Sequence, residues 1–227
     1  MVQLMIRADT REECAYLITC LNRAAQLKIE HLWDYASGTE FGRGRYAGVF
    51  PARRRTDQPS LEYDESLVNN NSKPMDKQSA LAQYNCALKV IDKAQFWHRV
   101  VKGRERADTL VRETSVQATL TAKCGKIATF LKLRGFFETS ENFVIELELL
   151  EGTDLFQHIS SKGTLPEHEA AMILRDMLTS LEAMNRVGLA HRDIKPANVL
   201  MCDRKKDGVS VKVGDFGMST FVGVDGL

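Results

Sequence analysis

The segment HRDIKPAN, residues 191–198, constrains this chain more than any other part of its sequence. It places a carboxylate, an ammonium group and an amide within six residues, and a run of alternating valines then leads to Asp215-Phe216-Gly217. A carboxylate can orient a hydroxyl group, an ammonium group binds phosphate, and amide and carboxylate oxygens are hard ligands for a divalent cation. The two segments therefore predict a site for phosphate and metal.

Composition narrows the class of protein without identifying it. The 227 residues carry 31 basic and 30 acidic side chains, a net charge of +1, and 44% of them are hydrophobic. These proportions exclude collagen-like, low-complexity and wholly disordered chains, and the near-neutral charge argues against a dedicated nucleic-acid or membrane-surface binder. No run approaches the roughly 18 apolar residues of a transmembrane helix.

The start of the chain and its cysteines indicate a compartment. The N-terminus lacks the basic and then apolar pattern of a signal peptide. The five cysteines are scattered and contain no CxxC pair. We therefore expect neither a zinc site nor a disulfide framework, but a reduced, cytoplasmic protein.

Two segments stand apart from the rest of the chain. Residues 1–30 predict a strand and then a helix, with Thr10 and Glu13 spaced as a capping box. This pair cannot bury a core alone, so we expect an extension packed on its neighbour or the end of a larger unit. Residues 51–85 are polar and lack periodicity, which predicts a long surface insertion or a disordered loop. We interpret the Arg53–Arg55 triplet within it as solvated charge, in preference to a docking or phosphorylation signal.

The remaining segments show strand and helix patterns. We expect a strand at 86–92, a charged helical region at about 94–122, a hairpin at 130–150, and strands at 198–201 and 209–213.

A strong helix is predicted to begin near Thr164. Thr164 and Glu167 are spaced as a second capping box, Pro166 stands in the first turn, and Gly188 marks the end. The expected buried stripe of this helix consists of Leu174, Met177, Leu178, Leu181 and Met184.

A glycine-bearing turn lies between two predicted strands, with the pattern Gly42-x-Gly44-x-x-Ala47-Gly48-Val49. Glycines there let backbone N–H groups approach a phosphate. A Rossmann motif is excluded because Val49-Phe50 continues a strand that Pro51 ends, and a Walker A motif because Gly-Lys-Ser/Thr is missing. On its own, the pattern fits a plain glycine-bearing hairpin equally well.

Lys89 lies in the middle of an apolar strand. Its desolvation is costly unless it meets anions, and phosphate oxygens with one carboxylate would suit it. Glu105, Asp108 and Glu113 are the carboxylates that the following helical region offers. We favour Glu113, because the apolar residues around it could face the sheet.

Taken together, the Gly-rich loop, the strand lysine, HRD-x-x-x-x-N and DFG resemble the signature set of protein kinases. The resemblance covers about residues 34–227. It implies an α+β, bilobal fold with a complete small lobe of β-sheet and helix C, and a partial, mainly helical large lobe. Lys195, two residues after Asp193, matches the serine/threonine branch. The stretches HRDIKPANVLM and LELLEGTDLFQHI resemble the calmodulin-dependent-kinase group.

The resemblance implies how ATP is held. Gly42 and Gly44 would cover its phosphates, and Lys89 would bind the α- and β-phosphates while paired with Glu113.

It also implies the catalytic and metal-binding residues. Asp193 would accept or orient the substrate hydroxyl, with Lys195 beside it for phosphate, and Asn198 and Asp215 would hold Mg²⁺. His191 is expected to be a structural residue.

In the hinge pattern of that group, Leu147 would be the gatekeeper. The backbone of Glu148 and Leu150 would meet the adenine edge, and Asp154 would lie near the ribose. The residues expected to sandwich the adenine ring are Val49, Ala87 and Leu200.

Four features depart from the family pattern. Ala47 replaces a loop glycine, and Gln117 stands where the family usually has an apolar residue that packs toward Phe216. The insertion at 51–85 is unusually long. The chain stops at Leu227, inside the activation segment, so we expect a kinase domain over 31–227 that is incomplete at its C-terminus.

Residues 1–30 resemble the last strand and C-terminal helix of a pleckstrin-homology domain, with Leu17 where that family usually has Trp. A plain helical leader is the alternative. Recruitment to membrane lipid is expected only if a full domain of this kind precedes the chain.

The resemblance implies an enzyme that uses ATP and Mg²⁺ and transfers the γ-phosphoryl group to serine or threonine hydroxyls of proteins, with no nucleic-acid partner. Two alternatives stay open. One is a truncated kinase-like module that binds nucleotide or a partner without transfer. The other is a small-molecule phosphotransferase of kinase-like fold, which Lys195-Pro196 and DFG disfavour.

Overall fold

A computed structural model of the chain describes residues 10, 28–44, 46–55, 79, 82–125, 127, 129–150, 152–202 and 208–222. Most of the strand and helix predicted over 1–30 lies outside these residues, and so does most of the insertion predicted over 51–85. Among the described helices, none combines the length and the apolar character that a membrane crossing requires.

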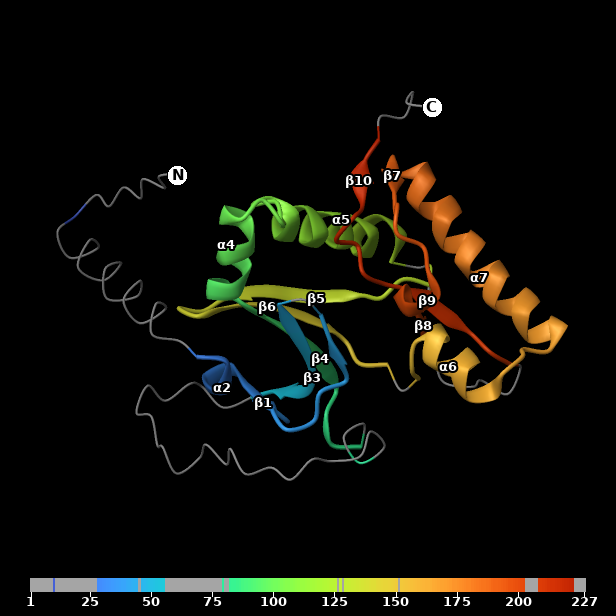
Figure 1. Cartoon of the computed structure of the whole chain (residues 1–227), viewed down its shortest axis with the longest axis horizontal. Coiled ribbons are helices and arrows are strands. Elements are labelled where there is room, and N and C mark those ends of the chain that lie inside the picture. The colour runs from blue at the N-terminus through green and yellow to red at the C-terminus, as the bar shows by residue number, and fades with distance from the viewer. Residues whose placement is uncertain are drawn as a thin grey trace.

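The centre of the molecule is an antiparallel sheet with strand order β1-β3-β4-β6-β5 and with β2 paired to β3 (Figure 1). Its strands are β1 (Trp33–Tyr35), β2 (Gly42–Arg43), β3 (Ala47–Arg54), β4 (Cys86–Asp92), β5 (Leu133–Glu138) and β6 (Asn142–Glu148). The strand predicted at 86–92 and the hairpin predicted at 130–150 are confirmed.

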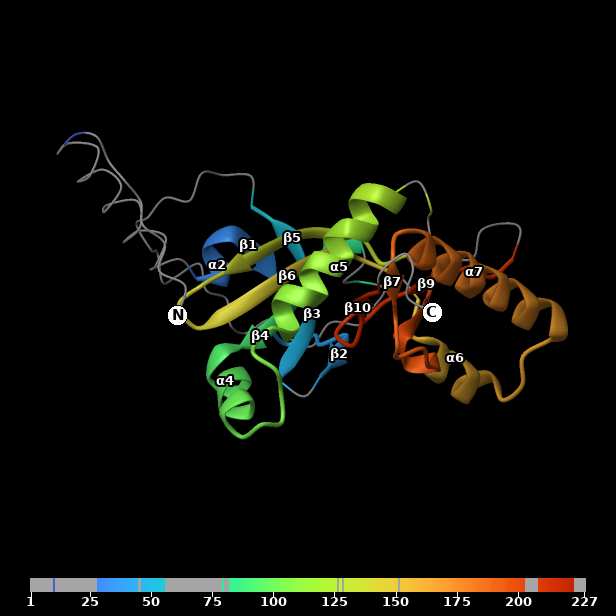
Figure 2. The same cartoon turned by 90° about the horizontal axis from the view of Figure 1, so that it is seen from above.

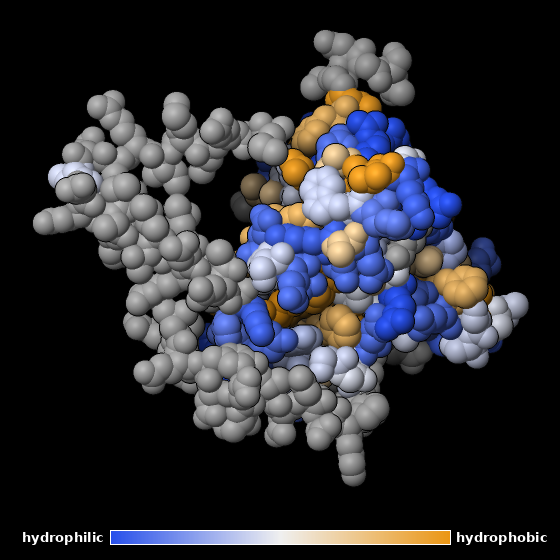
Figure 3. Space-filling model, turned by 60° about the vertical axis from the view of Figure 1, so that its left-hand side comes forward, coloured by the Kyte–Doolittle hydropathy of each residue, from blue (hydrophilic) through white to orange (hydrophobic). Residues whose placement is uncertain are grey.

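Both faces of this sheet carry an apolar core, because alternate side chains of a strand point to opposite faces. Ile91 and Ile145 belong to a cluster that α4 and α5 complete, and Leu88 and Val144 belong to a cluster that α2 (Ile29–Leu32) completes. Figure 2 shows α5 lying across the sheet. The surface in Figure 3 is mostly hydrophilic, with apolar residues in small separate patches, as expected when the large apolar side chains are inside.

Strand β3 runs further than the sequence predicts, so the expected insertion over 51–85 begins too early. Pro51 does not end the strand: it lies in register with Ala87, and its carbonyl accepts from the backbone N–H of Ala36 at 3.1 Å. Proline lacks only the N–H donor, so its carbonyl can still join a sheet. The strand continues to Arg54.

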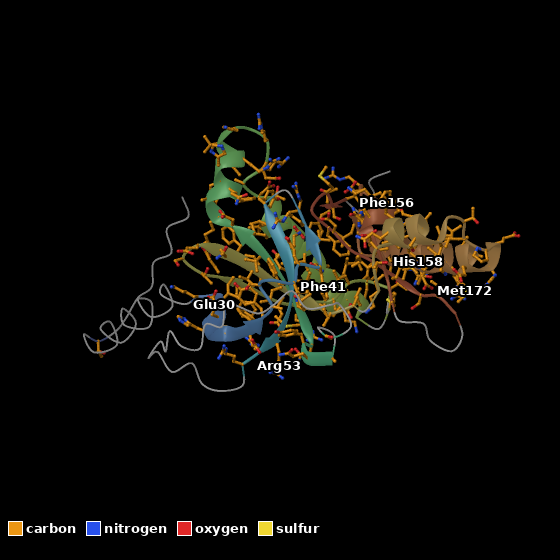
Figure 4. The ribbon with its side chains drawn as sticks, turned by 60° about the horizontal axis from the view of Figure 1, so that its bottom comes forward. Glu30, Phe41, Arg53, Phe156, His158 and Met172 are labelled. Carbon is orange, nitrogen blue, oxygen red and sulfur yellow. The ribbon has the colours of Figure 1, made fainter. Side chains whose placement is uncertain are left out.

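The arginine triplet is exposed to solvent, as predicted, and two of its residues also have partners. Arg53 lies 3.6 Å from the carboxylate of Asp34, and the guanidinium of Arg54 lies over the rings of Trp33 and Phe137. Figure 4 shows Arg53 near the end of β3, at the same end of the sheet as Glu30 of α2.

The helical region predicted at 94–122 consists of two helices, α4 (Lys93–Val101) and α5 (Thr109–Cys124). Asp92 caps α4, since its carboxylate accepts from the backbone N–H of Gln95 at 2.8 Å. The buried face of α5 contains Thr109, Leu110, Glu113, Val116, Gln117, Leu120 and Cys124. We call residues 28–148 the small lobe.

Residues 152–222, which we call the large lobe, are built around two helices (Figure 1). The elements are α6 (Leu155–Lys162), α7 (Glu167–Arg186), β7 (Leu189–Ala190), the 3₁₀ turn η2 (Pro196–Asn198), β8 (Val199–Met201), β9 (Val211–Val213) and β10 (Thr220–Phe221). Strands β8 and β9 pair, and so do β7 and β10. Figure 4 shows Phe156 and His158 on α6 and Met172 on α7, away from the sheet.

The start of α7 differs from the prediction. The helix begins at Glu167 after Pro166, and no side chain caps it, so the predicted capping box of Thr164 with Glu167 is wrong. Proline suits a helix start because its fixed φ fits the helix and its missing N–H would be unpaired there. Gly188, with φ of +70°, follows the helix end as predicted.

The buried stripe of α7 is also only partly as predicted. Leu174 and Leu178 are 54% and 56% exposed. The buried residues of the helix are Ile173, Ser180, Ala183 and Met184. The helix packs through the side that faces β7 and β9, and the described residues do not cover the side that bears Leu174 and Leu178.

Candidate active site

The glycine-bearing turn joins β2 and β3 in an antiparallel hairpin. A side chain at Gly42 would meet nothing within 4 Å, whereas one at Gly48 would come within 2.8 Å of Phe50 and Glu40. Gly42 therefore has open space beside it, and Gly48 lets the ends of the Phe50 and Glu40 side chains pack closely on the backbone. Ala47 points its methyl group into the small-lobe core, which explains why this hairpin accepts alanine at the position of the third glycine.

Lys89 and Glu113 form an ion pair across the gap between β4 and α5, with Nζ 2.5 Å from Oε1. Burial acts to lower the pKa of Lys89, but the carboxylates of Glu113 and Asp215 outweigh it and raise that pKa overall. Lys89 therefore stays protonated and lies close enough to Asp215 to sense its charge. The pairing that the sequence favoured over Glu105 and Asp108 is present.

Asp193, Lys195 and Asn198 meet at η2. The carboxylate of Asp193 accepts from Lys195 Nζ at 2.7 Å and from Asn198 Nδ2 at 3.0 Å, and Asn198 Nδ2 also donates to the Asp193 carbonyl at 2.8 Å. The hydrogen bond from Lys195, followed by that from Asn198, lowers the pKa of Asp193. This carboxylate is therefore ionised and held in one place near neutral pH.

Asp215 is brought to the same place by a direct backbone contact. The N–H of Gly214 donates to the Asn198 carbonyl at 2.9 Å. Asp215 itself has φ of +55°, a left-handed conformation that is uncommon for residues other than glycine. Such strain persists only where the surroundings fix it, and it often marks a functional position.

His191 and Phe216 are buried beside the segments that carry Asp193 and Asp215. His191 is buried, and its Nε2 lies 3.1 Å from the Gly214 carbonyl while its Nδ1 accepts from the Asp193 N–H at 3.3 Å. Burial lowers the pKa of His191. Its neutral ring thus joins the Asp193 and Asp215 segments, in agreement with a structural role.

The donor set fits a hard divalent cation. Both hydrogen bonds of the Asn198 amide use its nitrogen, which leaves its oxygen as the group for a cation, and Asp215 adds an exposed carboxylate. Mg²⁺ commonly takes one or two such protein oxygens, and substrate phosphate and water complete its shell. The described residues contain no cluster of three or more His, Cys, Asp or Glu that could hold a metal by protein alone.

The predicted adenine-binding residues come from both lobes. Leu147 is buried and lies in register with Ala87, and both share a core cluster with Val49. Leu200 lies on β8, next to Asp154, with which it forms an isolated β-bridge. The Asp154 carboxylate caps α6 through Gln157 N.

Glu148 and Leu150 lie where the chain passes from the small lobe toward the large lobe. The Glu148 carboxylate accepts from Lys212 Nζ at 2.6 Å and from the backbone N–H of Lys132 at 2.7 Å. The family resemblance implies a role for the backbone of Glu148 only, so these side-chain contacts are new.

Sequence reasoning missed Lys212, whose ammonium contacts the Glu148 carboxylate. It noted Gly48 and Gln117 without giving them these contacts: Gly48 lies against Phe50 and Glu40, and the Gln117 amide donates to the Leu131 carbonyl at 3.0 Å. The sequence contained a signal for Lys212. It is a charged residue between two valines, Val211 and Val213, in a strand that is otherwise buried, so an anionic partner could have been expected.

Comparison with known proteins agrees with this geometry. The family model for the protein kinase domain matches residues 71–226, more than half of the chain. A Dictyostelium discoideum protein named probable myosin light chain kinase is 27% identical over 189 residues, which cover 83% of this chain and 44% of that protein. Calcium-dependent protein kinase 11 of Arabidopsis thaliana is 40% identical over 91 residues, covering 40% of this chain and 18% of its own.

A third relative, serine/threonine-protein kinase DCLK3 of Mus musculus, is 31% identical over 136 residues, which cover 60% of this chain and 16% of that protein. The chain thus spans less than half the length of these curated relatives. The match over 71–226 contains Lys89, Asp193, Asn198 and Asp215. The chain belongs to the protein kinase domain family.

Proposed function

We propose that this chain is the catalytic part of an ATP-dependent serine/threonine protein kinase. The observation that carries the proposal is the arrangement of four residues from separate segments. Asp193 and Asn198 are hydrogen-bonded to each other, the backbone next to Asp215 bonds to Asn198, and Lys89 of β4 is influenced by the charge of Asp215. The relatives named as serine/threonine-protein and calcium-dependent protein kinases support the same class of reaction.

Each residue has a proposed part in binding ATP. Lys89, held by Glu113, would neutralise the α- and β-phosphates. Gly42, which has open space beside it, and Gly44 would let the hairpin backbone lie over the phosphates. Val49, Ala87 and Leu200 would enclose the adenine, and the backbone of Glu148 and Leu150 would bond its edge. Asp154 would lie near the ribose.

The transfer step would depend on position and charge. Asp193, ionised at neutral pH, would orient the serine or threonine hydroxyl and take up its proton, while Lys195 would neutralise the moving phosphoryl group. Mg²⁺ held by Asn198 and Asp215 would neutralise phosphate charge. The bond from the γ-phosphorus to the β–γ bridging oxygen breaks, and a bond to the substrate oxygen forms in line with it.

The proposal extends to the domain boundaries of the chain, its substrates and its compartment. We propose a kinase domain over 31–227, supported by the pairing of β1 with the strands that carry the site, and an extension over 1–30 before it. Helix α2 crosses this boundary, since Ile29 is buried in the small-lobe core. Proteins with Ser or Thr would be the substrates, and the cytoplasm the compartment. Lipid recruitment would require a complete pleckstrin-homology domain upstream.

The test is phosphoryl transfer from radiolabelled ATP in Mg²⁺ to a protein substrate mixture, using the chain in the full length that its gene encodes. We expect labelled serine and threonine, and a rate that falls by about 100-fold or more with Asp193→Asn, because orientation of the hydroxyl is lost. Glu182→Gln on the exposed side of α7 is the matched control. Nucleotide binding without any transfer by the parent would instead favour a binding module.

A further inference from the structure

The contact between Glu148 and Lys212 joins segments that are far apart in the chain. Glu148 ends β6, and Lys212 lies in the middle of β9, three residues before Asp215. Their side chains are only 15% and 14% exposed, and the ammonium lies 2.6 Å from Oε2. A charged pair with so little exposure is taken out of water at a large cost.

The Glu148 carboxylate is used on both of its oxygens. Oε2 accepts from Lys212, and Oε1 accepts from the backbone N–H of Lys132, whose carbonyl in turn accepts from the Glu148 N–H at 3.0 Å. The side chain therefore has a fixed direction, and it fixes the backbone at the point where the chain leaves the small lobe.

Strand β9 carries this restraint to Asp215. The Val213 N–H donates to the Thr129 carbonyl at 2.8 Å, and the Val213 carbonyl accepts from the Leu131 N–H at 3.0 Å. Lys212 therefore lies on a strand that is bonded to the same segment, 129–132, that Glu148 contacts. Movement of either end of the Glu148–Lys212 contact would alter that segment.

We propose that Glu148 and Lys212 are positioning residues. Their contact couples the segment 148–150, whose backbone would bind the adenine edge, to Asp215, which would bind the metal. The inference rests on the proposed function. Buried ion pairs contribute little net stability compared with neutral residues, but breaking one partner leaves an uncompensated charge. A single substitution therefore affects both stability and positioning, whereas a double substitution removes both charges and affects positioning alone. Comparing the two separates these effects.

The experiment compares Glu148→Gln, Lys212→Met, the double variant and Lys212→Arg. Calorimetry measures the affinity for ATP with and without Mg²⁺, and for adenosine, and thermal unfolding measures stability. We expect each neutralising single variant to lose stability and to bind ATP with Mg²⁺ about tenfold more weakly. The double variant should regain the stability, since no lone charge remains, but should stay about tenfold weaker in that affinity.

Two readouts separate positioning from a structural role. The gain in ATP affinity that Mg²⁺ provides should shrink in the double variant, and Lys212→Arg, which keeps the charge, should recover most of it. If a single variant fails to fold, the double variant remains decisive. If the folded double variant binds ATP with the affinity and the Mg²⁺ dependence of the parent, the coupling role is wrong but the proposed function stands. A parent chain that binds no nucleotide would overturn the proposed function as well.

Discussion

Trp33 in the small lobe and Leu178 in the large lobe are both large apolar side chains in regular elements, but their surroundings differ. Trp33 is fully buried and meets Phe137 edge to face with ring centroids 4.7 Å apart, whereas Leu178 is 56% exposed. The sheet of the small lobe is covered on both faces by elements close to it in sequence. Helix α7 is covered on one side only by the described residues. Apolar periodicity thus indicates which side chains can be buried, and neighbouring elements decide which ones are.

The largest effect should come from Trp33→Ala. Removing this ring leaves a cavity under α2 and β5, so the free energy of unfolding should fall by about 3–5 kcal/mol. Urea unfolding followed by circular dichroism would measure it. A loss below about 1 kcal/mol would mean that the outer face of the sheet can collapse and is not a second core.

The next effect compares two ion pairs of the same length. Lys89–Glu113 and Arg186–Glu182 both have contacts of 2.5 Å, but the first is largely buried and the second is 70% and 63% exposed. Glu113→Gln should lower the free energy of unfolding by about 2–3 kcal/mol, because Lys89 loses its ion-pair partner and keeps only the charge of Asp215 nearby. Glu182→Gln should change it by less than about 1 kcal/mol. Equal effects in urea titrations would contradict the role of burial.

A smaller effect should appear with pH at His191, which joins the Asp193 and Asp215 segments. Its pKa in the folded chain is below the ordinary value of 6.5, so the unfolded chain binds the proton first as pH falls. The contribution of this neutral ring to the free energy of unfolding is therefore complete above pH 6.5, the ordinary pKa, and is lost progressively as the pH falls below 6.5. Unfolding at about pH 5.5 and about pH 7.5 should show a difference that His191→Gln reduces. An unchanged difference in the variant would assign the pH effect to other groups.

The smallest effect should come from Leu178→Lys. Since the side chain is already exposed on α7, and lysine is as good a helix former as leucine, stability should change by less than about 0.5 kcal/mol. The same urea titration measures it, with the buried Ile173→Lys as the contrasting variant. A large loss with Leu178→Lys would show that something covers this side of α7 in solution.

Some elements could be predicted from sequence because their signals are local. The strand Cys86–Asp92 follows from a short, mostly apolar run, and the end of α7 at Gly188 follows from the positive φ that glycine readily adopts. The capping box at Thr164 was wrong although its spacing was right, because spacing does not ensure that the side chain reaches the helix N–H groups. Pro51 misled for the related reason that a proline carbonyl can still pair.

The candidate site also has features that the sequence determined and features that only the tertiary structure decided. The residue types and order of Lys89, Asp193, Asn198 and Asp215 are determined by the sequence, because phosphate and metal chemistry needs those groups whatever surrounds them. The tertiary structure decided which carboxylate faces Lys89, and it selected Glu113 by placing that turn of α5 against β4. It also decided that Glu148 and Lys212 meet, since their contact joins positions that no local pattern relates. Local chemistry can be read along a chain, but burial and long-range pairing depend on how distant segments pack.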